Sequence, residues 1–149
     1  MKEEFIPYKE EFIPYNQALA LKKLGFEERC FSYYVDQNHL KIPHFVYEKN
    51  KNLQNGWCLA PIFSQAFRWI REKYGLESYI NPELPFSYNN PKYTVVFIQT
   101  TKGFITYTDN TIWVSRVREN IERKRFSTHK EAELECLKKL IEIIESKSE

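Results

Sequence analysis

The sequence predicts an α+β protein: one two-layer domain in which an antiparallel sheet of three to five strands packs against two or three helices. Apolar residues recur with helical spacing near residues 61–75 and 130–146. Runs of β-branched and aromatic residues lie between them, at 93–117. The chain has 149 residues, of which 42% are hydrophobic and 16% aromatic, enough for one sizeable core. We expect this domain to span residues 16–149, after an N-terminal segment, residues 1–15, that is free to be flexible.

That N-terminal segment contains an identical tandem repeat. Residues 2–8, Lys-Glu-Glu-Phe-Ile-Pro-Tyr, are repeated at once as residues 9–15. The unit is too short for a solenoid repeat, which needs about 20 residues. One interpretation is a duplication in a terminus that tolerates insertions. The other is a doubled docking motif for a partner, with the anchors Phe5, Tyr8, Phe12 and Tyr15.

The first half of the expected domain contains one helix and two candidate strands. Asn16 is a candidate N-cap for a helix that ends at Gly25, with Phe26 making the apolar contact of a Schellman motif. Residues 30–35 have the composition of a strand. A second strand is expected at 42–47, and Pro43 would confine it to a sheet edge. Residues 48–56 form a polar loop.

In the second half the chain is expected to run helix, three strands, helix. Pro61 fits a first helical turn, and Gly75 fits the end of that helix. A Pro-rich loop then leads to strands at 93–100, 104–108 and 111–117, with turns at Lys102-Gly103 and Asp109-Asn110. Residues 95–98 are apolar throughout, which indicates a central strand.

The last helix is expected over residues 130–146. Ser127 or Thr128 would be its N-cap, and Glu131 stands at the capping-box position for Thr128. Its leucines and isoleucines form an apolar stripe that would pack on the sheet, beside the preceding helix.

Composition argues against several classes of protein. The three cysteines are an odd number without a Cys-x-x-Cys pair, so a secreted disulfide framework is not expected. The sequence contains no run of about 18 apolar residues, so it predicts no membrane-spanning helix, and it shows no recognisable signal peptide. We therefore expect a protein of the host-cell cytoplasm, without membrane association. The four glycines are not clustered, which excludes the common nucleotide-binding loops.

The residues that could carry chemistry do not form a convincing site. Cys58 precedes a predicted helix whose N-terminus would lower the thiol pKa, but the only downstream histidine, His129, lies at a helix cap. The alternative for Cys58 is a packed core thiol. Cys30, His39 and His44 lack a fourth ligand for a tetrahedral metal site. The sequence therefore predicts no catalytic residue, no metal and no cofactor, and a protein that is not an enzyme.

One short stretch is clearly basic. Residues 113–130 hold six cationic side chains against Glu119 and Glu122, a net charge of +4. The cationic residues are Arg116, Arg118, Arg123, Lys124, Arg125 and Lys130. Arginine suits phosphate, and Trp113 could stack on a base, so this stretch is our candidate surface for a nucleic acid or a partner. The alternative is an ordinary solvated face.

Three blocks of the sequence resemble a known set of proteins. They are residues 12–26 (FIPYNQALALKKLGF), 61–74 (PIFSQAFRWIREKY) and 128–143 (THKEAELECLKKLIEI). They are similar to uncharacterised small proteins of Bacteroidetes-type phages and mobile elements. The resemblance implies a non-enzymatic binding protein, with a counter-defence inhibitor of the anti-CRISPR type as the expected function. Its partner would be a host or defence protein, such as an RNA-guided nuclease, or the RNA that this nuclease carries.

A second resemblance is topological. The expected order of helix, three strands and helix from residue 61 to 146 is similar to double-stranded RNA-binding domains. This implies the alternative function, a nucleic-acid-binding accessory protein. The final helix departs from that family, because Lys130 is the only lysine at its N-terminus.

Overall fold

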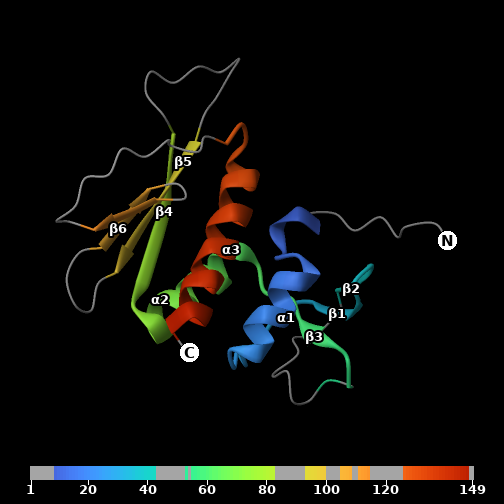
Figure 1. Cartoon of the computed structure of the whole chain (residues 1–149). Coiled ribbons are helices and arrows are strands. Elements are labelled where there is room, and N and C mark those ends of the chain that lie inside the picture. The colour runs from blue at the N-terminus through green and yellow to red at the C-terminus, as the bar shows by residue number, and fades with distance from the viewer. Residues whose placement is uncertain are drawn as a thin grey trace. The chain divides into compact units, whose positions relative to one another are not determined.

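The computed structural model describes residues 9–42, 53, 55–82, 93–99, 105–108, 111–114 and 126–147 (Figure 1). The chain forms two compact units, Met1–Ala66 and Phe67–Glu149, and their boundary falls inside α2 (Phe63–Tyr74). Each unit contains its own antiparallel sheet. The α+β class is therefore confirmed, with the described strands divided between two sheets. Within the described residues, every helix is too short or too polar to cross a membrane.

The first unit contains a small three-stranded sheet, ordered β2-β1-β3. Its described elements are η1 (Lys9–Glu11), α1 (Tyr15–Lys23), β1 (Tyr33–Asp36), β2 (His39–Lys41) and β3 (Cys58–Leu59). Tyr34 on the central strand lies opposite Leu40 and Cys58, and all three are buried. The second strand ends before Pro43. Most of its predicted range, and most of the predicted polar loop, lies outside the described residues.

The predicted C-terminal end of α1 is confirmed, whereas the predicted N-cap is wrong. Gly25 has φ 94°, its N–H donates to the carbonyl of Lys22, and the N–H of Phe26 donates to the carbonyl of Leu21. These are the two hydrogen bonds of a Schellman motif, and Phe26 packs in the core with Leu21. At the other end the N-cap is Pro14, not Asn16. The helix begins earlier because Pro14 presets the extended backbone of a cap, although it has no side-chain cap bond.

The second unit contains a four-stranded antiparallel sheet, ordered β4-β5-β6-β7. The strands are β4 (Leu76–Pro82), β5 (Tyr93–Gln99), β6 (Ile105–Thr108) and β7 (Thr111–Val114). The central position of the apolar strand β5 is confirmed. The two turns predicted between the last three strands lie outside the described residues.

β4 is the element that the sequence prediction missed. Its seven residues pair without interruption with β5, from Leu76 opposite Gln99 to Pro82 opposite Tyr93. Polar residues and a terminal proline made this stretch resemble a loop. A proline is tolerated here because β4 is an edge strand and Pro82 is its last residue.

The last helix, α3 (His129–Lys147), follows the prediction closely. The hydroxyl of Thr128 accepts the N–H of Glu131 at 3.1 Å, so the predicted N-cap is confirmed. Its buried stripe includes Ala132, Leu137 and Leu140, each with no exposed surface. This helix packs on β4 and β5 and runs beside them in Figure 1, as expected for the sheet-covering helix of an α+β layer.

Candidate functional site

The basic stretch, residues 113–130, begins within β7 (Thr111–Val114), the last strand of the second unit. Trp113 lies in β7, opposite Thr106 of β6. Five of the predicted binding residues lie outside the described residues: Arg116, Arg118, Arg123, Lys124 and Arg125. Lys130 is described, in the first turn of α3. The structure thus places both ends of the basic stretch, at β7 and at α3, within one unit.

Strand register decides which sheet face carries Trp113. Successive residues of a strand alternate between the two faces. Ser78 of β4 hydrogen-bonds the thiol of Cys136, a buried residue of α3, so Ser78 is on the helix-facing side. Glu77 is on the opposite side. Glu77 pairs with Ile98 of β5, Ile98 pairs with Thr106 of β6, and Thr106 pairs with Trp113 of β7. Residues that pair directly across strands lie on the same face of a sheet. Trp113 therefore belongs to the sheet face opposite the one that packs on α3.

The sheet face that carries Trp113 also carries the carboxylate of Glu77, which forms an ion pair with Arg71. Glu77 is half exposed, and its carboxylate lies 3.7 Å from Nε of Arg71 in α2. The geometry is that of a surface ion pair, which contributes at most about 1 kcal/mol to stability. The positive charge of Arg71 nevertheless offsets the charge of Glu77, which would repel a phosphate bound on this face.

Lys130 is part of an ion-pair cluster at the N-terminus of α3. Its Nζ lies 3.7 Å from one carboxylate oxygen of Glu133, and Nδ1 of His129 lies 3.0 Å from the other. Glu133 is only 15% exposed, whereas the side chains of His129 and Lys130 are about half exposed. Positive charge in the first turn opposes the helix dipole, and Glu133 compensates for it. The charge that Lys130 can offer to a phosphate is thereby reduced.

The topology of the second unit departs from that of a double-stranded RNA-binding domain. The predicted order of helix, three strands and helix is wrong, because β4 adds a fourth strand between α2 and β5. This addition weakens the topological resemblance. It also provides the broader sheet on which Trp113 lies.

Cys58 is not the activated thiol that its position before a helix suggested. It lies in β3 with no exposed surface, and burial raises its pKa to about 11. Lys22 acts in the opposite direction, but its Nζ already donates to the carbonyl of Trp57 at 2.7 Å. The expectation of a lowered pKa is therefore wrong: desolvation of the thiolate outweighs the charge of Lys22.

The other two cysteines are buried in the same way. Burial raises the pKa of Cys30 and of Cys136 to about 12. All three thiols are free and buried. At neutral pH they are protonated, which fits packed core thiols.

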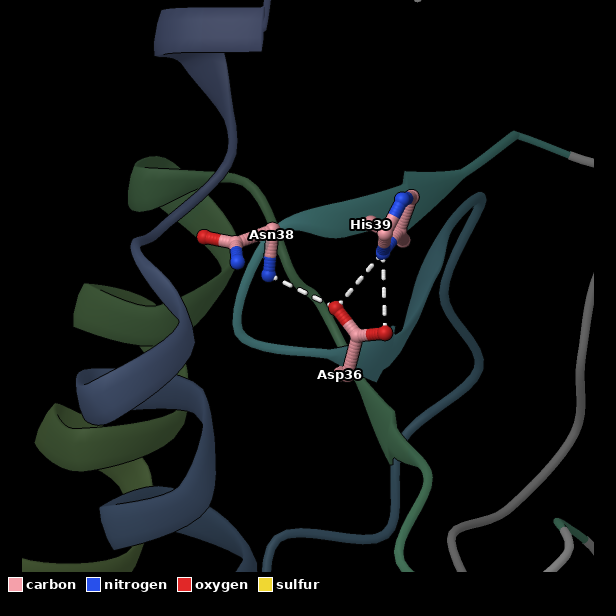
Figure 2. A network of polar contacts seen from close by, with 3 residues as sticks. All are labelled: Asp36, Asn38 and His39. Carbon is pink, nitrogen blue, oxygen red and sulfur yellow. Dashed lines mark hydrogen bonds and ion pairs between the residues drawn. The ribbon is translucent and has the colours of Figure 1, made fainter. Parts of the chain in front are cut away.

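A polar network that the sequence analysis did not single out lies at the turn between β1 and β2. Figure 2 shows Asp36 between two donors: one oxygen accepts the backbone N–H of Asn38 at 2.8 Å, and Nδ1 of His39 lies 2.7 and 2.8 Å from the two oxygens. The Asn38 bond, followed by the His39 bond, lowers the pKa of Asp36. An aspartate two residues before the amide that it accepts is an Asx-turn signal, and the sequence Asp-Gln-Asn-His contains it.

This network is not a metal site by itself. Of the three metal-ligand candidates, Cys30 is buried, His39 pairs with Asp36, and His44 lies outside the described residues. In the described part of the chain, no three His, Cys, Asp or Glu side chains are grouped so that they could hold a metal ion. Asp36 and His39 are both half exposed, and their contact orients the imidazole at the hairpin turn.

Of the four predicted docking anchors in the N-terminal repeat, the structure describes the two that belong to the second copy. Phe5 and Tyr8, in the first copy, lie outside the described residues. Phe12 and Tyr15, in the second copy, are half-buried within the first unit. Phe12 forms an antiparallel bridge with Ile62, and the ring of Tyr15 contacts the ring of Tyr34 edge to face. A role for either copy in binding a partner stays a prediction.

Comparison with known proteins adds no further assignment: no family model, no curated protein and no solved structure matches this chain.

Proposed function

We propose that this protein is a non-catalytic binding protein that engages the nucleic acid of a nucleoprotein through β7 and the basic stretch that follows it. The observation that carries the proposal is the register of Trp113 on the sheet face opposite α3, at the start of the segment of net charge +4, residues 113–130. Arg116 follows Trp113 by three positions in the sequence, so an aromatic and a cationic residue type stand close together in the chain.

The chemistry of these residues suits a polyanion that carries planar bases. Guanidinium groups bind phosphate oxygens in a bidentate manner, and a tryptophan ring can stack on a base of any sequence. The burial of all three thiols supports a role in binding, since none of them is poised as a nucleophile at neutral pH.

The target class comes from the sequence resemblance. Small proteins of phages and mobile elements that lack a catalytic site commonly act by occupying a host machine. The RNA-guided nuclease of a defence system is such a machine, and it exposes both protein and RNA. We therefore propose a counter-defence inhibitor of the anti-CRISPR type as the biological role.

The second candidate, a nucleic-acid-binding accessory protein, is favoured by the helix-sheet-helix order of the second unit. Two observations rank it lower. The sheet has a fourth strand, and Lys130, the one lysine at the N-terminus of α3, is paired with Glu133. A duplex-binding helix of that family would need more positive charge there.

A direct binding assay tests the shared step of both functions. Fluorescence anisotropy at about 50 mM salt should detect RNA or DNA binding. If about four phosphates of a single strand are neutralised, the logarithm of the association constant should fall with a slope near −3 against the logarithm of salt. Changing Arg116, Arg118, Arg123, Lys124 and Arg125 to Gln should abolish binding. The control Lys138→Gln/Lys139→Gln removes charge from α3 and should leave binding intact.

A pull-down from host lysate separates the two candidates. A defence nucleoprotein retained before and after nuclease treatment supports the inhibitor, whereas retention of RNA alone supports the accessory protein. Absence of nucleic-acid binding at low salt, together with an empty pull-down, would refute both. If Cys58→Ala abolished function without lowering stability, the non-catalytic assignment would be overturned.

A further inference from the structure

The second copy of the N-terminal repeat occupies a well-defined site in the first unit. Ile13 has no exposed surface, and its N–H donates to the carbonyl of Pro61 at 3.0 Å. The hydroxyl of Tyr34 donates to the carbonyl of Ile13 at 2.8 Å. We call the part of the unit that makes these contacts, Tyr34, Pro61 and Ile62, the FIPY site.

Contacts of the residues near Ile13 in the chain, one through the backbone and one through aromatic rings, complete this site. Phe12 pairs with Ile62 in an antiparallel bridge. The rings of Tyr15 and Tyr34 lie 5.5 Å apart at an interplanar angle of 77°, a favourable edge-to-face contact. The site therefore binds the four residues by two hydrogen bonds to the backbone of Ile13, one from the Tyr34 hydroxyl and one to the Pro61 carbonyl, together with one buried aliphatic side chain and one aromatic contact.

The first copy of the repeat presents the same four residues, Phe5-Ile6-Pro7-Tyr8, in the same order. The first copy therefore offers the FIPY site the same backbone groups and side chains, although its Tyr8 would not be the first residue of α1 as Tyr15 is. We propose that the FIPY site binds either copy, so that the chain exchanges between two N-terminal registers. In the major register Ile13 occupies the site, and in the minor register Ile6 occupies it.

The connection to α1 sets the balance between the registers. With the first copy in the site, residues 9–15 become an insertion between Tyr8 and Asn16. Closing a loop of this length disfavours the minor register by about 20-fold. The shift would break the hydrogen bond from the N–H of Ala18 to the carbonyl of Pro14, so the start of α1 must re-form. Asn16, a preferred N-cap residue, can then begin the helix.

The exchange is tested by damaging one copy at a time. Ile13→Asp puts a carboxylate into a position with no exposed surface. In a chain without residues 2–8, which has no second copy to offer, this change should raise the unfolding equilibrium constant by at least about 100-fold, because it buries a charged group without a partner. In the full chain the first copy should rescue the site, and the loss should be about 20-fold, the cost of the loop.

Matched variants make the result specific. Ile6→Asp in the full chain should change stability by less than twofold. The double variant Ile6→Asp/Ile13→Asp should be as unstable as the shortened chain with Ile13→Asp. Deleting residues 9–15 leaves the same sequence as deleting residues 2–8, so one shortened chain serves both comparisons. The milder Ile13→Ala should show the same ranking between the full and the shortened chain.

Amide hydrogen exchange reports the register directly. In the full chain with Ile13→Asp, the protected amide should be that of Ile6, because its N–H would then donate to the carbonyl of Pro61. The proposal is overturned if the full chain with Ile13→Asp is as unstable as the shortened one, or fails to fold. It is also overturned if the amide of Ile6 stays unprotected in that variant.

Discussion

The hydroxyl of Tyr34 offers a clean test of what holds the first unit together. Tyr34→Phe removes the donor to the carbonyl of Ile13 and keeps the ring that contacts Tyr15. Because that carbonyl belongs to a residue with no exposed surface, it would be left buried without its donor. The expected loss is about 1–3 kcal/mol in the free energy of unfolding, the cost of an unsatisfied buried acceptor.

The assay for Tyr34→Phe is urea unfolding at pH 7, with Tyr15→Phe as the control. The structure gives the hydroxyl of Tyr15 no hydrogen bond with any described residue, so its removal should cost less than about 0.5 kcal/mol, as for most surface changes. Equal stability of Tyr34→Phe and the unmodified chain would refute the importance of this hydrogen bond.

The same variant predicts a pH dependence. Burial raises the pKa of Tyr34 to about 12 in the folded chain, against about 10 in the unfolded chain. For a raised pKa the stabilisation is complete below pH 10 and is lost as the pH rises towards 12. The stability difference between the unmodified chain and Tyr34→Phe should therefore shrink over this interval. A difference that stayed constant to pH 12 would contradict the assigned burial.

Three further predictions concern caps, thiols and the hairpin turn. Thr128→Ala removes the N-cap of α3 and should cost about 0.5–2 kcal/mol in thermal or urea unfolding, with Ser127→Ala as a neutral control; an equal cost for both would contradict the cap assignment. The thiols of Cys30, Cys58 and Cys136 should resist labelling by a thiol reagent at pH 8 until the chain is unfolded, and rapid labelling of Cys58 in the folded chain would contradict its burial. The lowered pKa of Asp36 predicts a turn stabilisation that is full above its ordinary value near 3.8 and is lost as the pH falls through the lowered value. An NMR titration of His39 and the Asn38 amide should show that loss in the unmodified chain and not in Asp36→Asn.

Features that depend on residues close together in the chain were predicted correctly, whereas the start of α1, which depends on tertiary contacts, was not. Gly25 and Thr128 were identified correctly because a left-handed glycine and a threonine N-cap act on backbone groups a few residues away. Asn16 was assigned wrongly as a cap. Its propensity is high, but Pro14 already has the extended backbone of a cap, and the contacts of Phe12 and Ile13 with residues 61–62 hold the chain before it in place.

The candidate binding surface was only partly predictable. The sequence located the basic stretch and Trp113, because charge and residue type are properties of the chain itself. It could not assign Trp113 to a sheet face, since that depends on β4, which the polar composition of residues 76–82 concealed. The Asp36–His39 contact was missed for a related reason: it depends on a turn geometry, although its Asx-turn signal was present.

Four features could be predicted from local sequence patterns: the α+β class, the three α-helices of the described chain, the central place of the apolar strand and the tandem repeat of residues 2–15. These follow from residue periodicity, capping and repetition, which act over a few residues. Three features depend on tertiary contacts instead: the division into two sheets, the raised pKa values of the thiols and the burial of Ile13 at the FIPY site. Each of those depends on desolvation or hydrogen bonding between segments distant in the chain, which a linear pattern does not encode.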